Sequence, residues 1–325
     1  MVFKIGVKPL PDLIDEIAGE LIASVDPIDG LSHWSDAADA VPGWNTVERT
    51  GIKARRALKY TNGLEVMYLA LESRNDWYSQ WAGYTAKGLR ITFSASWDSI
   101  NNTYPPINQQ TSIPFETFSG GMPSPQSNLA ALNIYYYLWV ESNGFVIMAK
   151  PEPSNSNTQQ SFFVVMERNP NKEYADGQSN FYCLNLTNVW PSLSNPAYTY
   201  GDVHRSFLRP FAYQWPGVAT STAHPFYHCM ASGTLERYYS ILSPADRKVY
   251  YRKPLISNNK IEPGQANIAM APIFTSELWF PWNEEIGLID GDIIQVEGTT
   301  KKFLLKSMDS PDSINRLTYA MKYSD

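Results

Sequence analysis

The chain has 325 residues and carries 32 Asp and Glu against 26 Lys and Arg, so its formal net charge is −6. We expect no nucleic-acid partner, because an acidic chain is a poor general binder of polyphosphate. No run of about 18 apolar residues is present, and the first residues lack the apolar centre of a signal peptide. The sequence therefore predicts neither a membrane partner nor a secretory route.

Aromatic residues make up 14% of the chain, with 10 Trp and 20 Tyr, whereas charged residues make up only 18%. Ordinary soluble domains carry roughly 25% charged residues. Aromatic side chains favour β-strands, and Tyr and Trp are also enriched where subunits meet. The composition predicts a β-rich core, with contacts between subunits as the alternative use of the aromatic side chains. Cys183 and Cys229 are too few for a disulfide scaffold, and two buried thiols are expected, with one bridge between them as the alternative.

One amphipathic helix is predicted over residues 10–25. Pro9 and Pro11 mark its start, and acidic residues occupy its early turns, where negative charge suits the helix dipole. The apolar face of this helix must be covered by a sheet or by a neighbouring subunit. Its apolar members recur at helical spacing and are Leu10, Leu13, Ile14, Ile17, Leu21, Ile22 and Val25.

Two hairpins are predicted from Asn-Gly pairs between apolar runs. The first joins Ala54–Tyr60 to Leu64–Leu71, and the second joins Ile134–Val140 to Phe145–Lys150. Trp77–Tyr84 is expected to be an aromatic connector. Further strands are predicted over Gly88–Trp97, Ser161–Met166, Phe181–Leu186, Arg247–Leu255 and Ile268–Phe274, and Leu278–Trp282 is expected to lead into the C-terminal sheet.

The C-terminal stretch predicts three short antiparallel strands, Asp292–Val296, Lys302–Ser307 and Arg316–Tyr323. In the last strand apolar residues alternate with polar ones at a period of two, as in a half-buried strand. One face would hold Leu317, Tyr319, Met321 and Tyr323. We expect the opposite, charged face to carry Arg316, Lys322, Lys302 and Lys306.

The fold class predicted from these elements is mainly β, an antiparallel sandwich or barrel-like body with long loops and one N-terminal helix. No internal repeat is apparent, so one body over residues 1–325 is expected, with a division near 150–160 as the alternative. The stretches 26–52, 101–128 and 190–235 show little periodicity. We expect them to be loops that reach neighbouring subunits.

No catalytic, cofactor-binding or metal-binding residue is predicted. His224, His228 and Cys229 could supply metal ligands on a helix, but Pro225 and the aromatic neighbours favour a loop or strand. Asp290-Gly291-Asp292 lacks the ligand order of an EF-hand and is expected to be a turn. His33 and His204 stand alone in the sequence, and such histidines are usually structural or exposed.

Aromatic clusters are the remaining candidates for a binding surface. They could form a platform for sugar stacking, although core packing or a subunit contact is the more ordinary role of such clusters. The residues concerned are Trp77, Trp81, Tyr84, Trp279 and Trp282.

Two stretches resemble structural proteins of tailed bacteriophage particles. The first is the hairpin YYYLWVESNGFVIMAK followed by SFFVVMERNP, and the second is the closing IDGDIIQVEGTTKKFLLKSMDSPDSINRLTYAMKY. The resemblance is one of residue type and order, and it supplies no site residue. It implies synthesis in the host cytoplasm, residence in the virion, no cofactor, and assembly with copies of itself and other virion proteins.

The leading functional hypothesis is a non-enzymatic virion structural protein of a phage tail, baseplate or neck. An alternative is a particle protein that binds a receptor or a glycan through its Trp-rich loops. A third is a carbohydrate-active hydrolase on a β scaffold, since two carboxylates can always meet in a cleft.

Overall fold

The computed structural model describes backbone over residues 1–37, 54–78, 85–94, 96–98, 100, 109–118, 133–151, 162–168, 181–187, 204–208, 225–227, 251–252, 255–258, 273–274, 278–281, 289–308 and 317–325. The chain forms two compact units. The first comprises Met1–Thr187 with Ser206–Thr222, and the second comprises Asn188–Arg205 with Ala223–Asp325. Residues 150–160 lie inside the first unit, and the expectation of a single body stays a prediction.

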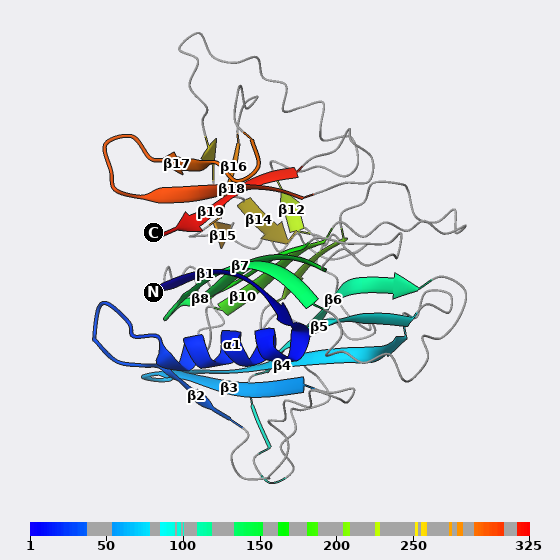
Figure 1. The fold of residues 1–325 in the computed structure, drawn as a ribbon. Helices are drawn as coiled ribbons and strands as arrows, with labels where there is room; N and C mark the ends of the chain where they lie inside the picture. Colours follow the sequence, from blue (N-terminus) through cyan, green and yellow to red (C-terminus); the bar gives the residue numbers. More distant parts are fainter. Residues whose placement is uncertain are drawn as a thin grey trace, which may run out of the picture. The chain divides into compact units, whose positions relative to one another are not determined.

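The mainly β class with one helix is confirmed, and Figure 1 shows the strands and the helix α1. A six-stranded antiparallel sheet has the order β1-β7-β8-β9-β10-β11. Neighbouring strands along most of this sheet are also neighbours in sequence, except that β1 pairs with β7. Its strands are β1 Val2–Pro9, β7 Asn133–Glu141, β8 Gly144–Pro151, β9 Phe162–Arg168, β10 Phe181–Thr187 and β11 His204–Leu208.

A five-stranded antiparallel sheet has the order β2-β3-β4-β5-β6, so every strand pairs with the next in sequence. Its strands are β2 Trp34–Asp36, β3 Ala54–Asn62, β4 Glu65–Tyr78, β5 Thr85–Ser94 and β6 Gln109–Phe118. Both predicted Asn-Gly hairpins form. Gly63 between β3 and β4 has φ 58°, and Gly144 at the start of β8 has φ 140°, values that favour glycine.

The helix α1, Leu10–Ala23, confirms the amphipathic prediction and ends two residues before its expected limit. Pro9 immediately precedes it and Pro11 lies in its first turn, positions at which proline removes no helical hydrogen bond. Its buried face packs into one core with side chains from both sheets, among them Leu58 and Leu69 of the five-stranded sheet and Leu138 of the six-stranded sheet. In Figure 1 the helix runs between β1 and β7 on one side and β3 and β4 on the other.

Strands β1, β2 and β6 of this unit were not predicted. Strand β2 lies within 26–52, so the loop prediction is wrong over Trp34–Asp36. Strand β1 lies in a segment to which we assigned no element, although Phe3, Ile5 and Val7 alternate with polar or small residues. Strand β6 lies within 101–128, so the loop prediction is wrong over Gln109–Phe118.

The physical reason for the error at β6 is its position at the end of the sheet. Gly88 of β5 pairs with Pro114, whereas Lys87 pairs with Glu116, so β6 carries an irregularity at this point. Proline cannot donate a ladder hydrogen bond and is tolerated on edge strands and at bulges. The edge position of β6 therefore accommodates Pro114.

The second unit contains a three-stranded sheet of order β12-β14-β15 and a five-stranded sheet of order β13-β16-β19-β18-β17. Strands β11 and β12 fall within 190–235. The loop prediction for this stretch is therefore wrong over the residues of these two strands. The strands of the two sheets are β12 Pro225–Tyr227, β14 Leu255–Asn258, β15 Ile273–Phe274, β13 Tyr251–Arg252, β16 Leu278–Pro281, β19 Leu317–Tyr323, β18 Lys302–Met308 and β17 Ile293–Gln295.

The three predicted C-terminal strands are confirmed as β17, β18 and β19, but the predicted charged face is wrong. Lys322 pairs with Phe303, so it lies on the face that forms the local core, whereas Lys302 pairs with Tyr323 on the other face. Lys306 is buried, and its Nζ lies 2.6 Å from Asp290 Oδ2. The local core consists of Phe303, Leu305 and Ala320 with Ile294 packed against them.

The predicted Asp-Gly turn before β17 is confirmed. Gly291 has φ 97°, and Asp292 Oδ2 accepts a hydrogen bond of 2.8 Å from the Ile289 N–H.

Cys183 on β10 is buried and free, as expected, and burial raises the pKa of its thiol. Cys229 lies outside the described residues. Across the described part of the chain, no helix is long and apolar enough to cross a membrane.

Candidate functional site

The connection between α1 and β2 is built tightly onto the end of the helix. Ser24 follows the last helical residue, and its hydroxyl donates to the Leu21 carbonyl at 2.6 Å. The Ser32 hydroxyl donates to the Ile22 carbonyl at 2.7 Å. These bonds satisfy carbonyls that the end of a helix otherwise leaves unpaired. They also hold both ends of the connection against α1.

Asp26 and Asp29 shape the connection itself. Asp26 Oδ1 accepts the Ile28 N–H at 2.8 Å, and Asp29 Oδ1 accepts the Leu31 N–H at 2.9 Å. Each is a turn in which an aspartate binds the backbone two residues on. The backbone also closes on itself, since the Asp26 N–H donates to the Leu31 carbonyl at 2.9 Å. One oxygen of each carboxylate is therefore committed to the backbone, and the other is available.

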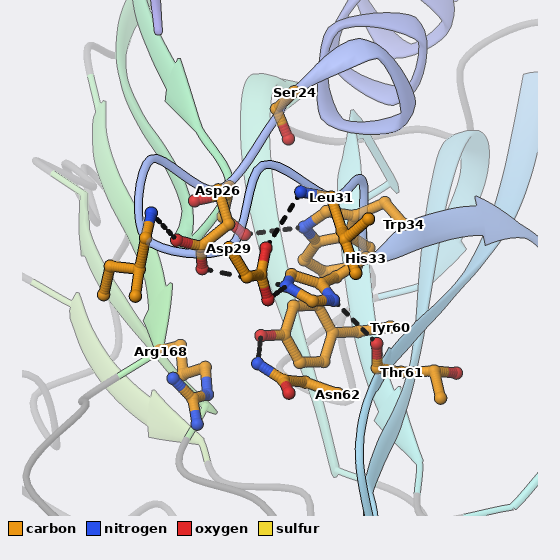
Figure 2. A network of polar contacts seen from close by, with 12 residues as sticks. Ser24, Asp26, Asp29, Leu31, His33, Trp34, Tyr60, Thr61, Asn62 and Arg168 are labelled. Carbon is orange, nitrogen blue, oxygen red and sulfur yellow. Dashed lines mark hydrogen bonds and ion pairs between the residues drawn. The ribbon is translucent and has the colours of Figure 1, made fainter.

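His33 faces the two available oxygens. Its Nδ1 lies 3.0 Å from the Thr61 carbonyl oxygen of β3, so in this bond Nδ1 carries the proton and donates. Its Nε2 lies 3.0 Å from Asp29 Oδ2 and 3.8 Å from Asp26 Oδ2. The His33 side chain is only 6% exposed, and Nε2 makes no hydrogen bond. Figure 2 shows Asp26 and Asp29 on one side of the ring and Thr61 on the other. We call Asp26, Asp29 and His33 the His33 cluster.

An aromatic base supports the His33 cluster. The His33 ring lies 5.5 Å from the Tyr60 ring, which in turn packs edge-on against Trp34 at 5.2 Å and Phe181 at 4.8 Å. The Trp34 Nε1–H donates to the Ser142 carbonyl at 2.9 Å. Because Phe181 belongs to the six-stranded sheet, Ser142 to its β7–β8 turn and Tyr60 to the other sheet, the cluster rests on the common core of the unit.

An ion pair between Arg168 and Glu65 lies beside this base. Arg168 Nε and one of its terminal nitrogens contact Glu65 Oε2 at 2.8 Å and 2.7 Å. Burial alone would lower the pKa of Arg168, but the Glu65 hydrogen bond and the neighbouring negative charges, Asp26 among them, raise it overall. Burial is the main reason that the pKa of the Tyr60 hydroxyl is raised. Arg168 stays charged, and the carboxylates that act on it are those of Glu65 and Asp26.

A second polar cluster joins β1 and β7 to α1. Lys4 Nζ contacts Glu16 at 3.0 Å and Glu20 at 2.5 Å, and Lys8 Nζ contacts Glu16 at 2.9 Å. The Tyr136 hydroxyl donates to the second oxygen of Glu16 at 2.5 Å. Two lysines thus face two glutamates. We call these five residues the Glu16 cluster.

The ionisation of the Glu16 cluster follows from its contacts. Burial raises the pKa of Glu16, but the hydrogen bonds from Tyr136, Lys8 and Lys4 outweigh it, so the pKa is lowered overall. The Glu20 hydrogen bond is the main cause of the raised pKa of Lys4. Burial, followed by the bond to Glu16, raises the pKa of Tyr136. Glu16 and Lys4 are therefore held in their ionised forms by their partners.

The opposite face of β1 is apolar and open to solvent. Ile5 is 60% exposed and Val7 is 42% exposed. Tyr135, which pairs with Val7 across the ladder, is 38% exposed, and Met1 at the start of the same alternation is 70% exposed. Among the described strands β1 pairs only with β7 and occupies the end of its sheet. We call Met1, Ile5, Val7 and Tyr135 the β1 strip.

The aromatic residues singled out in the sequence lie on different sheets or outside the described chain. Trp77 lies in β4, opposite Ala86 of β5, so the connector prediction is wrong for Trp77 and Tyr78. Trp279 lies in β16, opposite Ala320 of β19. Trp81, Tyr84 and Trp282 fall outside the described residues, and a sugar-stacking platform stays a prediction.

The His33 cluster was missed because His33 was treated as isolated. Its signal is Asp26, Asp29 and His33 within one short connection, and only the turns bring the three side chains together. In the part of the chain that the structure describes, no other group of three such side chains could hold a metal ion.

Comparison with protein-family models, curated proteins and solved structures gave no match to this chain.

Proposed function

We propose that this chain is a non-enzymatic structural protein that assembles with copies of itself through strand β1. The observation that carries the proposal is the β1 strip, which lies beside a strand edge with no partner among the described strands. Exposed strand edges pair readily with other chains, and natural proteins usually protect them with charge, proline or a covering element. Here the exposed face presents Ile5 and Val7 instead of charge.

A second copy of the chain is the partner that best fits this edge. Two copies of β1 can pair antiparallel about a two-fold axis, as in a symmetric interface. A register centred on Gly6 sets Ile5 of one copy opposite Val7 of the other. Apolar side chains directly opposite each other in an antiparallel pair stabilise the sheet. The pairing would join two six-stranded sheets edge to edge.

The charges of β1 do not oppose this pairing. Lys4 and Lys8 point to the other face of the strand, where Glu16 and Glu20 of the same chain neutralise them. The strip is small, so a single contact of this kind is weak. Weak contacts suit a protein that must be soluble before it assembles and that gains affinity from many simultaneous contacts.

The resemblance to structural proteins of tailed phage particles supports a location for this assembly. We propose that the protein belongs to a virion, in a tail, baseplate or neck, where neighbouring proteins bring several copies together. Receptor or glycan binding and a hydrolase activity remain the alternatives, and no described contact favours either of them.

Sedimentation velocity over a concentration series tests the proposal. We expect the wild-type chain to form dimers or larger species as concentration rises, and Ile5→Lys to stay monomeric. Leu64→Lys is the matched control, because Leu64 is a fully exposed apolar residue that lies at the β3–β4 turn, away from β1. Circular dichroism should show that both variants fold. A wild-type chain that stays monomeric at millimolar concentration, or an Ile5→Lys variant that assembles as well as wild type, would contradict the proposal.

A further inference from the structure

We infer that the His33 cluster binds a divalent transition-metal cation through His33 Nε2 and one carboxylate oxygen each of Asp26 and Asp29. The three ligand atoms all lie within 4.8 Å of one another. Donor atoms around a tetrahedral zinc ion lie about 3.4 Å apart, given bonds of about 2.0–2.2 Å. The 3.0 Å and 3.8 Å separations from Nε2 bracket that value, so only small side-chain movements would be needed.

The state of His33 Nε2 carries the inference. The His33 side chain is only 6% exposed to solvent. Its Nε2 nevertheless makes no hydrogen bond. A buried polar atom without a partner costs free energy, and such atoms are rare in folded proteins. The atom lies 3.0 Å and 3.8 Å from two carboxylate oxygens, and a metal cation that binds the nitrogen and both oxygens would satisfy it in place of a proton.

The orientation of the ring is that of a metal ligand. Metal-bound histidines usually donate their other ring N–H to a carbonyl or carboxylate, which fixes the tautomer. His33 does so through Nδ1 and the Thr61 carbonyl, at 3.0 Å. In the neutral ring this leaves the lone pair of Nε2 pointing toward Asp26 and Asp29.

The carboxylates are also held in place. The Oδ1 atoms of Asp26 and Asp29 accept backbone N–H groups, which turns both Oδ2 atoms toward His33. The Asp26 side chain is 9% exposed, whereas that of Asp29 is 38% exposed. The site therefore opens to solvent on the Asp29 side, where a cation can enter and water can complete its coordination.

The charge of the surroundings favours a dication. Asp26, Asp29 and Glu65 contribute three negative charges, and Arg168 contributes one positive charge that is already paired with Glu65. Arg168 Cζ lies 6.0 Å from the centre of the Tyr60 ring, and Figure 2 shows the two side chains beside each other below the connection. A cation with two charges would balance the remaining two carboxylates.

The donor set selects the class of metal. An imidazole nitrogen favours zinc and the neighbouring transition metals, whereas calcium and magnesium prefer oxygen alone. The bound ion would tie the connection after α1 to β3, because His33 is anchored on Thr61. We assign the ion a structural role, since Trp34 and Tyr60 pack beneath the cluster.

Isothermal titration calorimetry of the tag-free chain with zinc chloride, and in parallel with calcium chloride, tests the inference. We expect saturable zinc binding at one site and no calcium binding at the same concentrations. Zinc should also raise the melting temperature by a few degrees, because a ligand of the folded state stabilises it. No zinc binding, or calcium binding without zinc binding, would overturn the inference.

Asp29→Asn identifies the site. Asparagine keeps an oxygen that can accept the Leu31 N–H, so the turn survives while the charged ligand is lost. We expect zinc affinity to fall at least about tenfold. Asp98→Asn is the matched control, because Asp98 Oδ1 accepts the Ile100 N–H at 2.9 Å in the same kind of turn. Zinc binding that is unchanged in Asp29→Asn, or weakened equally in Asp98→Asn, would place the metal elsewhere and overturn the assignment.

Discussion

The Glu16 cluster and the His33 cluster are both polar groups packed against α1 or its end, and they differ in how completely their atoms are satisfied. In the first, two lysines oppose two glutamates, and Tyr136 donates to the remaining oxygen of Glu16. In the second, two carboxylates face one ring nitrogen that has no hydrogen bond. A satisfied network contributes to the fold, whereas an unsatisfied buried atom shows where a further group can bind.

The two clusters also differ in how they reach solvent. Glu16 of α1 is half-buried and faces β1, its partners close over it, and its side chain is 9% exposed. In the His33 cluster the buried ring lies at the bottom and the 38% exposed Asp29 lies at the rim. Removal of a charge should therefore lower the free energy of unfolding clearly in the Glu16 cluster and very little in the His33 cluster.

The largest expected effect comes from removing the aromatic base of the His33 cluster. Tyr60→Ala should lower the free energy of unfolding by about 3–5 kcal/mol, because Tyr60 is fully buried between Trp34 and Phe181. Urea denaturation measures this loss. Tyr60→Phe is the control and should cost less than about 1 kcal/mol, since it removes only a 3.4 Å contact with Asn62. Equal losses in the two variants would show that the hydroxyl, not the ring, holds the base together.

Glu16→Gln breaks the satisfied cluster. Breaking a fully buried ion pair costs about 3–5 kcal/mol, but Lys4 and Lys8 are 33% and 39% exposed, so water screens part of the loss and we expect about 2 kcal/mol. Chemical denaturation at neutral pH provides the measurement. Glu20→Gln is the comparison and should cost under about 1 kcal/mol, because Lys4 keeps its contact with Glu16. A greater loss in Glu20→Gln would mean that Glu16 is not the centre of the network.

The pH dependence of stability should report the same cluster. Glu16 has a folded-state pKa below its ordinary value of 4.5, so its unfolded state binds more protons in that range. Its contribution to stability is present above pH 4.5 and is lost as the pH falls through the folded-state pKa. We expect the free energy of unfolding to fall less steeply below about pH 4.5 in Glu16→Gln than in wild type. Identical slopes in the two proteins would contradict the assignment of Glu16.

The smallest expected effect is that of Asp29→Asn on the metal-free protein. With a chelator present, the free energy of unfolding should change by less than about 0.5 kcal/mol, because the turn to Leu31 is kept and a carboxylate near Asp26 is neutralised. The same denaturation experiment measures it. A loss as large as that of Glu16→Gln would show that the His33 cluster is itself a stabilising ion pair.

Local sequence signals predicted the elements that depend on short-range chemistry. The helix follows from the apolar stripe after Pro9, and both hairpins follow from Asn-Gly pairs at Gly63 and Gly144. Strand β6 was missed because its proline is acceptable only at an edge, a property that the sheet decides. The faces of the C-terminal sheet were misassigned because the pairing of Lys322 with Phe303 depends on the register between strands.

The His33 cluster could be predicted from the sequence only in part. The sequence places Asp26, Asp29 and His33 close together along the chain, but the spacing does not show that both aspartates turn toward one ring nitrogen. That orientation depends on two backbone turns and on the Thr61 carbonyl, which belongs to a strand that follows later in the chain. The exposure of Ile5 and Val7 likewise depends on β1 lying at the end of its sheet, which alternation alone does not predict.

Nitrogen NMR of the histidine side chains tests most directly the claim that His33 Nε2 is an unused ligand atom. On addition of zinc, we expect the Nε2 resonance of His33 to shift strongly while Nδ1 keeps the signature of a protonated nitrogen bound to Thr61. The shift should be absent in Asp29→Asn at the same zinc concentration. Unchanged His33 resonances in a chain saturated with zinc would contradict the claim.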